Sequence, residues 1–125
     1  MITTQLETDL ALGGASGSDE QTASPDPGEH TLAAAAYRLT AVITGRPTIP
    51  GAIGIYFLAS PIAGLTSAQI RSRGRKWTLD NFGNGAEQQR STDVQASEGE
   101  YLHYAIDCGK IAETDVTLNL FVVEY

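Results

Sequence analysis

The sequence of 125 residues has a single cysteine, Cys108, only two histidines and no long apolar run. One cysteine cannot form an intrachain disulfide, so a buried core must hold the fold together. Without a run of 18 or more apolar residues, we expect no transmembrane helix and no membrane partner. The first ten residues, MITTQLETDL, lack the basic region and apolar core of a signal peptide, so we expect no export.

Lysine and arginine are absent from the first 30 residues, which carry six acidic side chains. The middle of this stretch, GGASGSDEQTASPDPGE, has no apolar side chain larger than alanine. Such a segment cannot bury enough surface to offset the entropy lost on ordering. We therefore expect an extended acidic arm over residues 1–30, followed by a folded domain over residues 31–125.

The start of the arm is different, because it carries apolar side chains four residues apart: Ile2, Leu6 and Leu10. Thr4 and Glu7 have the spacing of a capping box, so the pattern predicts one short helix. A helix of this length is marginal in water unless it packs on another surface. We expect these three apolar side chains to anchor the arm on a partner.

From residue 31 the apolar period changes to two, which is typical of half-buried strands. Strands are expected around Tyr37–Ile43, over 52–59, 76–82, 100–107 and 114–125, with one short strand near 92–95. A single helical turn is expected at 66–70. Short strands joined by Pro/Gly turns favour an all-β antiparallel sandwich of the jelly-roll type, and a barrel is the competing architecture.

The last strand is apolar on both faces, because Phe121, Val123 and Tyr125 interrupt the alternation of Val116 to Val122. A strand of this kind is central in its sheet or is covered by another chain. Both alternatives remain open from the sequence.

Residues with catalytic chemistry are few and do not form a motif. His103 and Asp107 share one face of a strand, but no serine elbow or reactive cysteine accompanies them. Metal ligands are not spaced as a site requires. We expect a structural histidine and no enzymatic activity, metal or cofactor; a small hydrolase that uses His103 and Asp107 is the weakest alternative.

Half of the eight basic side chains lie in one short run, RSRGRK, next to the only tryptophan, Trp77. Arginine suits bidentate contacts to carboxylate or phosphate. The net charge of -7 opposes binding to a polyanion, and single-strand readers present several aromatics along a basic groove. We therefore expect no nucleic-acid partner. The run is either a solvated loop or a contact for an acidic protein surface, such as the arm of a neighbouring copy.

The segment YRLTAVITGRPTIPGAIGIYFLASPIAG, with RGRKWTLDNFGNG and DVTLNLFVVEY after it, resembles small β-sandwich structural proteins of tailed bacteriophage particles. These proteins are of the capsid decoration (cement) or neck and tail accessory type. The resemblance covers roughly residues 37–125. It implies a non-enzymatic virion protein, assembled in the host bacterial cytoplasm, that binds the major capsid protein and neighbouring copies as an oligomer on the particle.

Seven side chains are the candidates for partner contacts: Ile2, Leu6, Leu10, Arg71, Arg73, Arg75 and Lys76. The alternative function is a carbohydrate-binding β-sandwich, free or in a tail fibre, in which exposed aromatic rings stack on sugars. The candidate rings are Trp77, Tyr101, Tyr104 and Tyr56, although the phase of Trp77 with Leu79 favours the core for its side chain.

Overall fold

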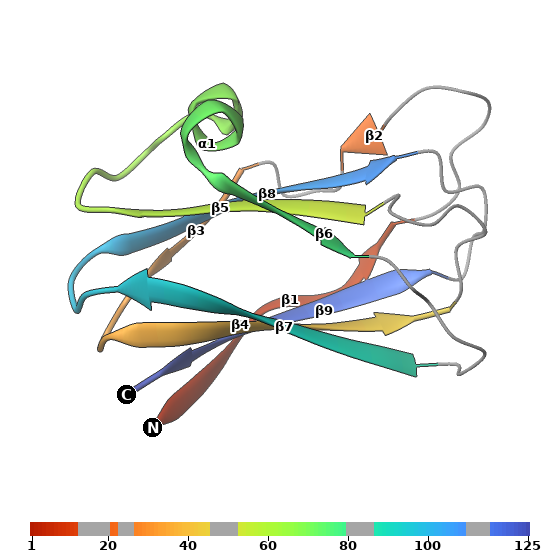
Figure 1. Cartoon of the computed structure of the whole chain (residues 1–125), viewed down its shortest axis with the longest axis horizontal. Coiled ribbons are helices and arrows are strands. Elements are labelled where there is room, and N and C mark those ends of the chain that lie inside the picture. The colour runs from red at the N-terminus through yellow and green to blue at the C-terminus, as the bar shows by residue number, and fades with distance from the viewer. Residues whose placement is uncertain (13–20, 23–26, 46–52, 80–86, 110–115) are drawn as a thin grey trace.

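Two antiparallel β-sheets pack face to face in the computed structural model, which describes residues 1–12, 21–22, 27–45, 53–79, 87–109 and 116–125 (Figure 1). The elements in chain order are β1 (Ile2–Ala11), β2 (Gln21–Thr22), β3 (Gly28–Thr31), β4 (Ala36–Thr44), β5 (Ile53–Ser60), α1 (Ser67–Arg73), β6 (Arg75–Leu79), β7 (Glu87–Ala96), β8 (Tyr101–Gly109) and β9 (Thr117–Glu124). The expected all-β sandwich is confirmed.

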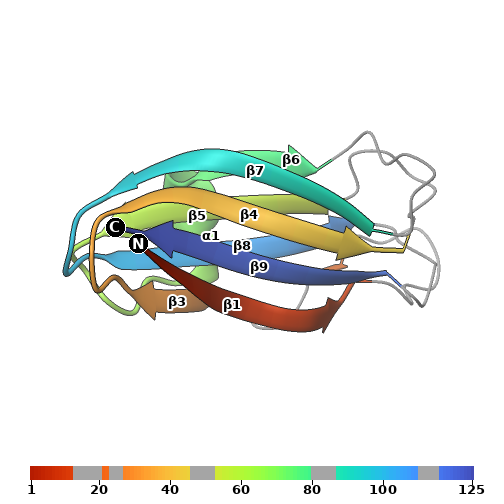
Figure 2. The ribbon, with the colours of Figure 1, turned by 90° about the horizontal axis from the view of Figure 1, so that it is seen from below.

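The strand order is that of a jelly roll. Sheet A has the order β1-β9-β4-β7, and sheet B has the order β2-β8-β5-β6, with β3 also paired to β8. The chain passes repeatedly from one sheet to the other, which produces the interlocked Greek keys of this architecture. Figure 2 shows the two sheets aligned, with β7 and β6 along one edge of the sandwich and β1 and β3 along the other.

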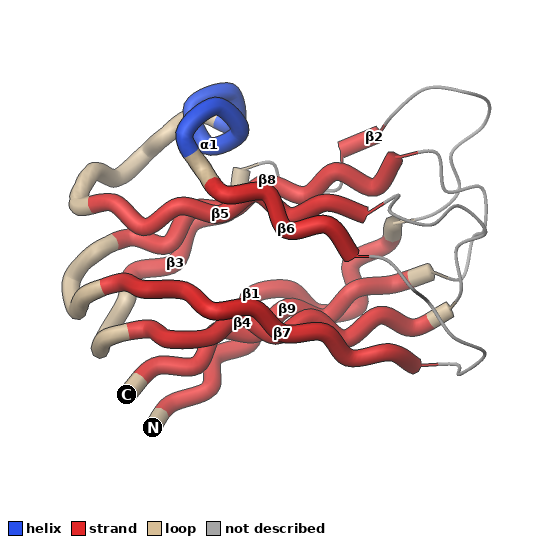
Figure 3. Tube along the Cα trace, viewed as in Figure 1, coloured by secondary structure: helices blue, strands red, loops and turns tan. Residues whose placement is uncertain are grey.

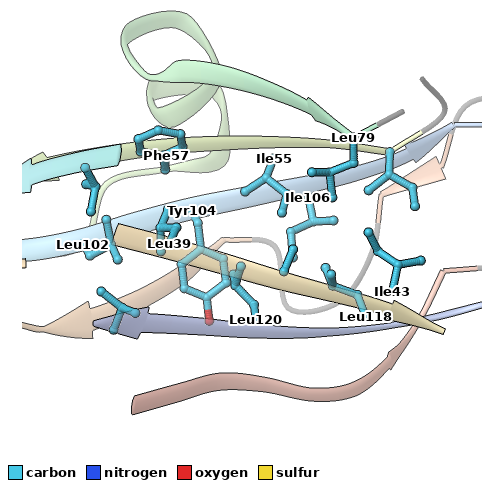
Figure 4. Close-up of a cluster of buried hydrophobic side chains, with 14 of the residues drawn as sticks. Leu39, Ile43, Ile55, Phe57, Leu79, Leu102, Tyr104, Ile106, Leu118 and Leu120 are labelled. Carbon is cyan, nitrogen blue, oxygen red and sulfur yellow. The ribbon is translucent and has the colours of Figure 1, made fainter. Parts of the chain in front are cut away.

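Alternating apolar side chains from both sheets fill the space between the layers (Figure 4). Each sheet contributes two inner strands, and the side chains of these strands that point between the sheets are buried. The main contributors are Leu39, Ala41 and Ile43 of β4, Leu118, Leu120 and Val122 of β9, Ile53, Ile55 and Phe57 of β5, and Leu102, Tyr104 and Ile106 of β8. Strands dominate the described chain, with α1 lying outside sheet B (Figure 3).

The helix expected at the start of the chain is wrong. Residues 2–11 form strand β1, which pairs antiparallel with β9, and Leu6 and Leu10 pack against the core of the same chain. Register shifts occur between Gln5 and Glu7 and again between Glu7 and Leu10, and Asp9 has a φ of 48°. Each bulge adds a residue to one strand, so a strand with bulges can mimic the four-residue spacing of a helix.

The expected boundary near residue 30 also differs from the structure. The sandwich begins at Ile2, because β1 is an edge strand of sheet A and β3 is paired to β8 in sheet B. An extended arm over residues 1–30 therefore does not describe residues 2–11 and 28–30. Residues 21–22 of the expected arm form β2, which pairs with β8, and residues 13–20 and 23–26 lie outside the described residues.

The strand at the end of the chain, the helical turn and β7 follow the sequence prediction in whole or in part. β9 lies between β1 and β4, so its two apolar faces reflect a central position in the sheet. The helical turn at 66–70 is confirmed and extends to Arg73, with a capping box between Thr66 and Gln69. β7 is longer than the short strand expected near 92–95. Among the described residues, no helix is long and apolar enough to cross a membrane.

Candidate protein-interaction surfaces

The basic run lies where α1 ends and β6 begins. Gly74 donates its backbone N–H to the carbonyl of Ile70 at 2.7 Å, and a Cβ at this position would lie 2.9 Å from the carbonyl oxygen of Phe57. Only a residue without a side chain fits this close approach to β5. The tight turn at Gly74 therefore divides the four basic side chains between the helix and the strand.

Arg71 and Lys76 lie on the outer face of sheet B. Arg71 donates from Nη2 to Oδ1 of Asp107 at 2.6 Å and from Nε to the same carboxylate, which ties α1 to β8. Lys76 Nζ lies 5.6 Å from the centre of the Tyr56 ring. The weakest alternative required His103 to pair with Asp107; in the described residues Asp107 instead binds Arg71, and His103 lies against Ile62 and Glu29. Arg71 thus has a structural role within this chain.

Arg73 and Arg75 instead line a groove of about 550 Å³ between β5 and β7. Its other lining residues are Phe57, Leu58 and Ala59 of β5 and Asp93, Val94 and Gln95 of β7. The guanidinium carbon of Arg75 lies 5.9 Å from the centre of the Phe57 ring, a cation–π distance. Both arginines are exposed, and neither forms an ion pair with a carboxylate of the described residues.

A second surface gathers exposed apolar and aromatic side chains at the end of sheet A where both termini lie (Figure 1). Met1 is 84% exposed, Ile2 48% and Tyr125 69%. The rings of Tyr37 and Tyr125 stack with centroids 4.8 Å apart, and the Tyr37 hydroxyl donates to Sδ of Met1 at 3.0 Å. The guanidinium of Arg38 lies 5.7 Å from the Tyr37 ring. We call Met1, Ile2, Tyr37, Arg38 and Tyr125 the terminal patch.

A buried carboxylate lies beside the terminal patch. Glu124 accepts backbone hydrogen bonds from Ala33 at 2.8 Å and Ala34 at 3.3 Å, and its Oε2 lies 3.3 Å from Nε2 of His30. Burial alone raises the pKa of the Glu124 carboxyl, but the Ala34 amide, His30 and the Ala33 amide together hold that pKa below its ordinary value. The ionised carboxylate therefore joins β9 to β3 and to the segment before β4.

A second polar pair links the sheets at the β1 edge. The Tyr104 hydroxyl, reaching from β8, donates to Oε2 of Glu7 on β1 at 2.6 Å. Gly28 makes room for the ring, since a Cβ there would lie 2.2 Å from Cζ of Tyr104. Burial raises the pKa of Glu7, which the hydrogen bond from Tyr104 partly offsets. Burial and the neighbouring Glu7 raise the pKa of Tyr104 far above its usual value.

His103 is fully buried beneath the loop that leads to α1. Its Nε2 lies 2.8 Å from the carbonyl oxygen of Ile62, and its Nδ1 lies 3.3 Å from Oε1 of Glu29. The same Glu29 oxygen accepts the backbone N–H of Gly64 at 2.7 Å. The Ile62 contact fastens the loop to β8, and the Gly64 hydrogen bond fastens it to β3. Among the described residues, no three His, Cys, Asp or Glu side chains gather as a metal site would require.

Most of the candidate sugar-stacking rings pack against other parts of the same chain. Trp77 is half-buried and packs against the core opposite Ile55, and Tyr104 belongs to the core itself. Tyr56 packs beneath α1 and lies near the cations of Arg71 and Lys76. Tyr101 is half-buried next to His103. Tyr125, which the sequence did not single out as a sugar-stacking ring, is the more exposed aromatic.

The structure thus separates the seven candidate contact residues. Leu6 and Leu10 are partly buried and pack against the core of their own chain, and Arg71 and Lys76 lie over the outer face of sheet B. Ile2 is exposed in the terminal patch, and Arg73 and Arg75 line the groove.

The sequence matches no protein-family model and no curated protein.

Proposed function

We propose that this protein is a non-enzymatic structural component of a tailed bacteriophage particle, where it decorates the capsid by binding the major capsid protein and neighbouring copies. Its place is the virion, which assembles in the bacterial cytoplasm. The proposal combines the sequence resemblance over residues 37–125 with the surfaces that the fold presents. Jelly rolls occur in viral capsid proteins and also in lectins, so the fold supports the proposal only by analogy.

The terminal patch is the observation that carries the proposal. Tyrosine, methionine and arginine are enriched in protein–protein interfaces, and they occur together here with Ile2 on one end of the sandwich. Stacking of Tyr37 on Tyr125 orders both rings before any partner binds, which lowers the entropy lost on association. Exposed apolar side chains that are gathered and rimmed by polar groups mark interaction sites.

Reconstitution on particles tests the proposal. Purified protein is added to phage particles that lack it, and binding is measured by co-sedimentation and by electron microscopy of the decorated positions. We expect saturable binding at symmetry-related sites, which Ile2→Asp weakens strongly. The control is Ala68→Asp, which places the same new charge on the exposed side of α1, far from the patch. No binding by the wild-type protein would contradict the proposed function.

A carbohydrate-binding role is the second candidate, and the exposed Tyr125 ring favours it. One face of that ring stacks on Tyr37, and the side chain is 69% exposed, so a sugar ring can approach. A glycan array separates the two functions. Selective binding of one glycan, lost in Tyr125→Ala, would support the carbohydrate role, whereas a capsid decoration protein shows no sugar preference.

A further inference from the structure

The groove beside Arg73 and Arg75 contains a strand position that the described residues leave vacant. β6 pairs with β5 only as far as Phe57, opposite Arg75, because the chain upstream of Gly74 turns away into α1. Residues 58–60 of β5 pair with β8 on one side. No described strand pairs with their other side, and Leu58 and Ala59 line the groove there. The backbone groups on this edge are therefore open to an added strand.

β7 forms the opposite wall of the groove. It pairs with β4 along one edge, and among the described strands none pairs with the other edge. Asp93, Val94 and Gln95 of this strand line the groove across from β5. An extended segment placed between the walls would lie in line with β6 and antiparallel to β5, with the polar edge of β7 alongside.

The positive charge of the groove favours an added segment that carries acidic side chains. Two exposed arginines face one carboxylate, Asp93, so the lining carries a net positive charge in a protein whose net charge is -7. Guanidinium groups form bidentate hydrogen bonds with carboxylates, and Phe57 and Val94 supply apolar contact at the same site. A polyanion such as a nucleic acid would meet the repulsion of the remaining acidic surface.

We propose that this groove binds an extended acidic segment of a partner protein by strand addition to residues 58–60 of β5, with carboxylates paired to Arg73 and Arg75. The identity of the partner rests on the proposed function: on a phage particle the segment belongs to the capsid subunit. The groove then supplies a second contact beside the terminal patch, and two linked weak contacts bind far more tightly than either alone.

Titration with a peptide tests the groove on the isolated protein. The probe is an acetylated and amidated hexapeptide of alternating aspartate and valine, followed by backbone amide shifts in two-dimensional NMR. We expect shifts at Leu58, Ala59 and Val94, and binding about tenfold weaker or more in Arg73→Glu and Arg75→Glu. The matched control is Lys76→Glu, which makes the same charge change on the opposite face of β6.

Each other outcome contradicts the groove proposal. Equal weakening by Lys76→Glu would mean that only overall charge matters, and tighter binding of a single-stranded oligonucleotide would mean a nucleic-acid site. Dimerisation of the free protein that Arg73→Glu abolishes would assign the groove to a second copy. The two proposals fail separately: peptide binding without addition to particles refutes the proposed function alone, and addition to particles without peptide binding refutes the groove alone.

Discussion

Glu124 of β9 and His30 of β3 meet across the two sheets, with Nε2 of His30 3.3 Å from Oε2 of Glu124. The carboxylate is almost completely buried and also accepts the amides of Ala33 and Ala34. Because these donors favour the ionised carboxylate, its contribution to stability is largest while it remains ionised.

The stability that Glu124 contributes depends on pH. The pKa of its carboxyl in the folded state lies below the ordinary value of 4.5, so its contribution is full above that pH and is lost as the pH falls through the lower folded value. We expect Glu124→Gln to lower the free energy of unfolding at pH 7 by about 1–3 kcal/mol. Urea denaturation between pH 7 and pH 3 measures both effects. Glu98→Gln, in the exposed turn before β8, is the control; an equal loss there would refute the assignment.

Glu7 gives the opposite pH dependence. Burial raises the pKa of Glu7 in the folded state, so its contribution is full below 4.5 and falls as the pH rises through the folded value. A glutamine keeps an acceptor for the Tyr104 hydroxyl without the cost of ionisation. We expect Glu7→Gln to leave the unfolding free energy at pH 7 unchanged or to raise it by up to about 1 kcal/mol.

Tyr104→Phe provides the complementary test of this pair. It removes the donor at 2.6 Å and leaves the ionised Glu7 without that partner, so we expect a loss of about 1–3 kcal/mol at pH 7. When Tyr104→Phe is combined with Glu7→Gln, it should lower the free energy of unfolding by less, and a double-mutant cycle measures the difference. Additive effects would show that the two side chains do not interact.

Gly74 is predicted to tolerate no side chain. In Gly74→Ala the new methyl group would lie 2.5 Å from the carbonyl oxygen of Ile70 and 2.9 Å from that of Phe57, both backbone atoms. We expect a loss of about 1–3 kcal/mol in the free energy of unfolding, as for other overpacked sites. Gly54→Ala is the matched control, because its nearest atom is Cε of the flexible Lys76 at 3.2 Å. If both variants are equally stable, the close approach at Gly74 is not a constraint.

Much of the fold could be predicted from the sequence, because the inner strands of each sheet follow the two-residue period. Leu39 and Leu118, for example, have polar residues on both sides in the sequence and are buried. β7 was largely missed because it is an edge strand with only Val94 fully buried, so its sequence reads as a polar loop. β1 was missed for another reason: its bulges imitate helical spacing.

The surfaces were less predictable than the fold, since they depend on which residues the strands bring together. Arg73 and Arg75 carried a visible charge signal, but Arg71 is held away from them by Asp107, and Lys76 points to the opposite face of β6 from Arg75. Tyr37 and Tyr125 are far apart in sequence, and their stacking requires β4 and β9 to be neighbours. The positions of Tyr37 and Tyr125 in one sequence do not show that their two strands are neighbours in the sheet.

The last prediction separates the structural part of β1 from its exposed end. Leu10 is partly buried and packs against the core, so Leu10→Ala should lower the free energy of unfolding by about 1–2 kcal/mol. Ile2 is 48% exposed in the terminal patch, so Ile2→Ala should change that free energy by less than about 0.5 kcal/mol. Urea denaturation of both variants gives the comparison. If β1 were a tether rather than a strand of the sandwich, neither substitution would lower the free energy of unfolding appreciably. The structure requires a clear loss of that free energy in Leu10→Ala alone.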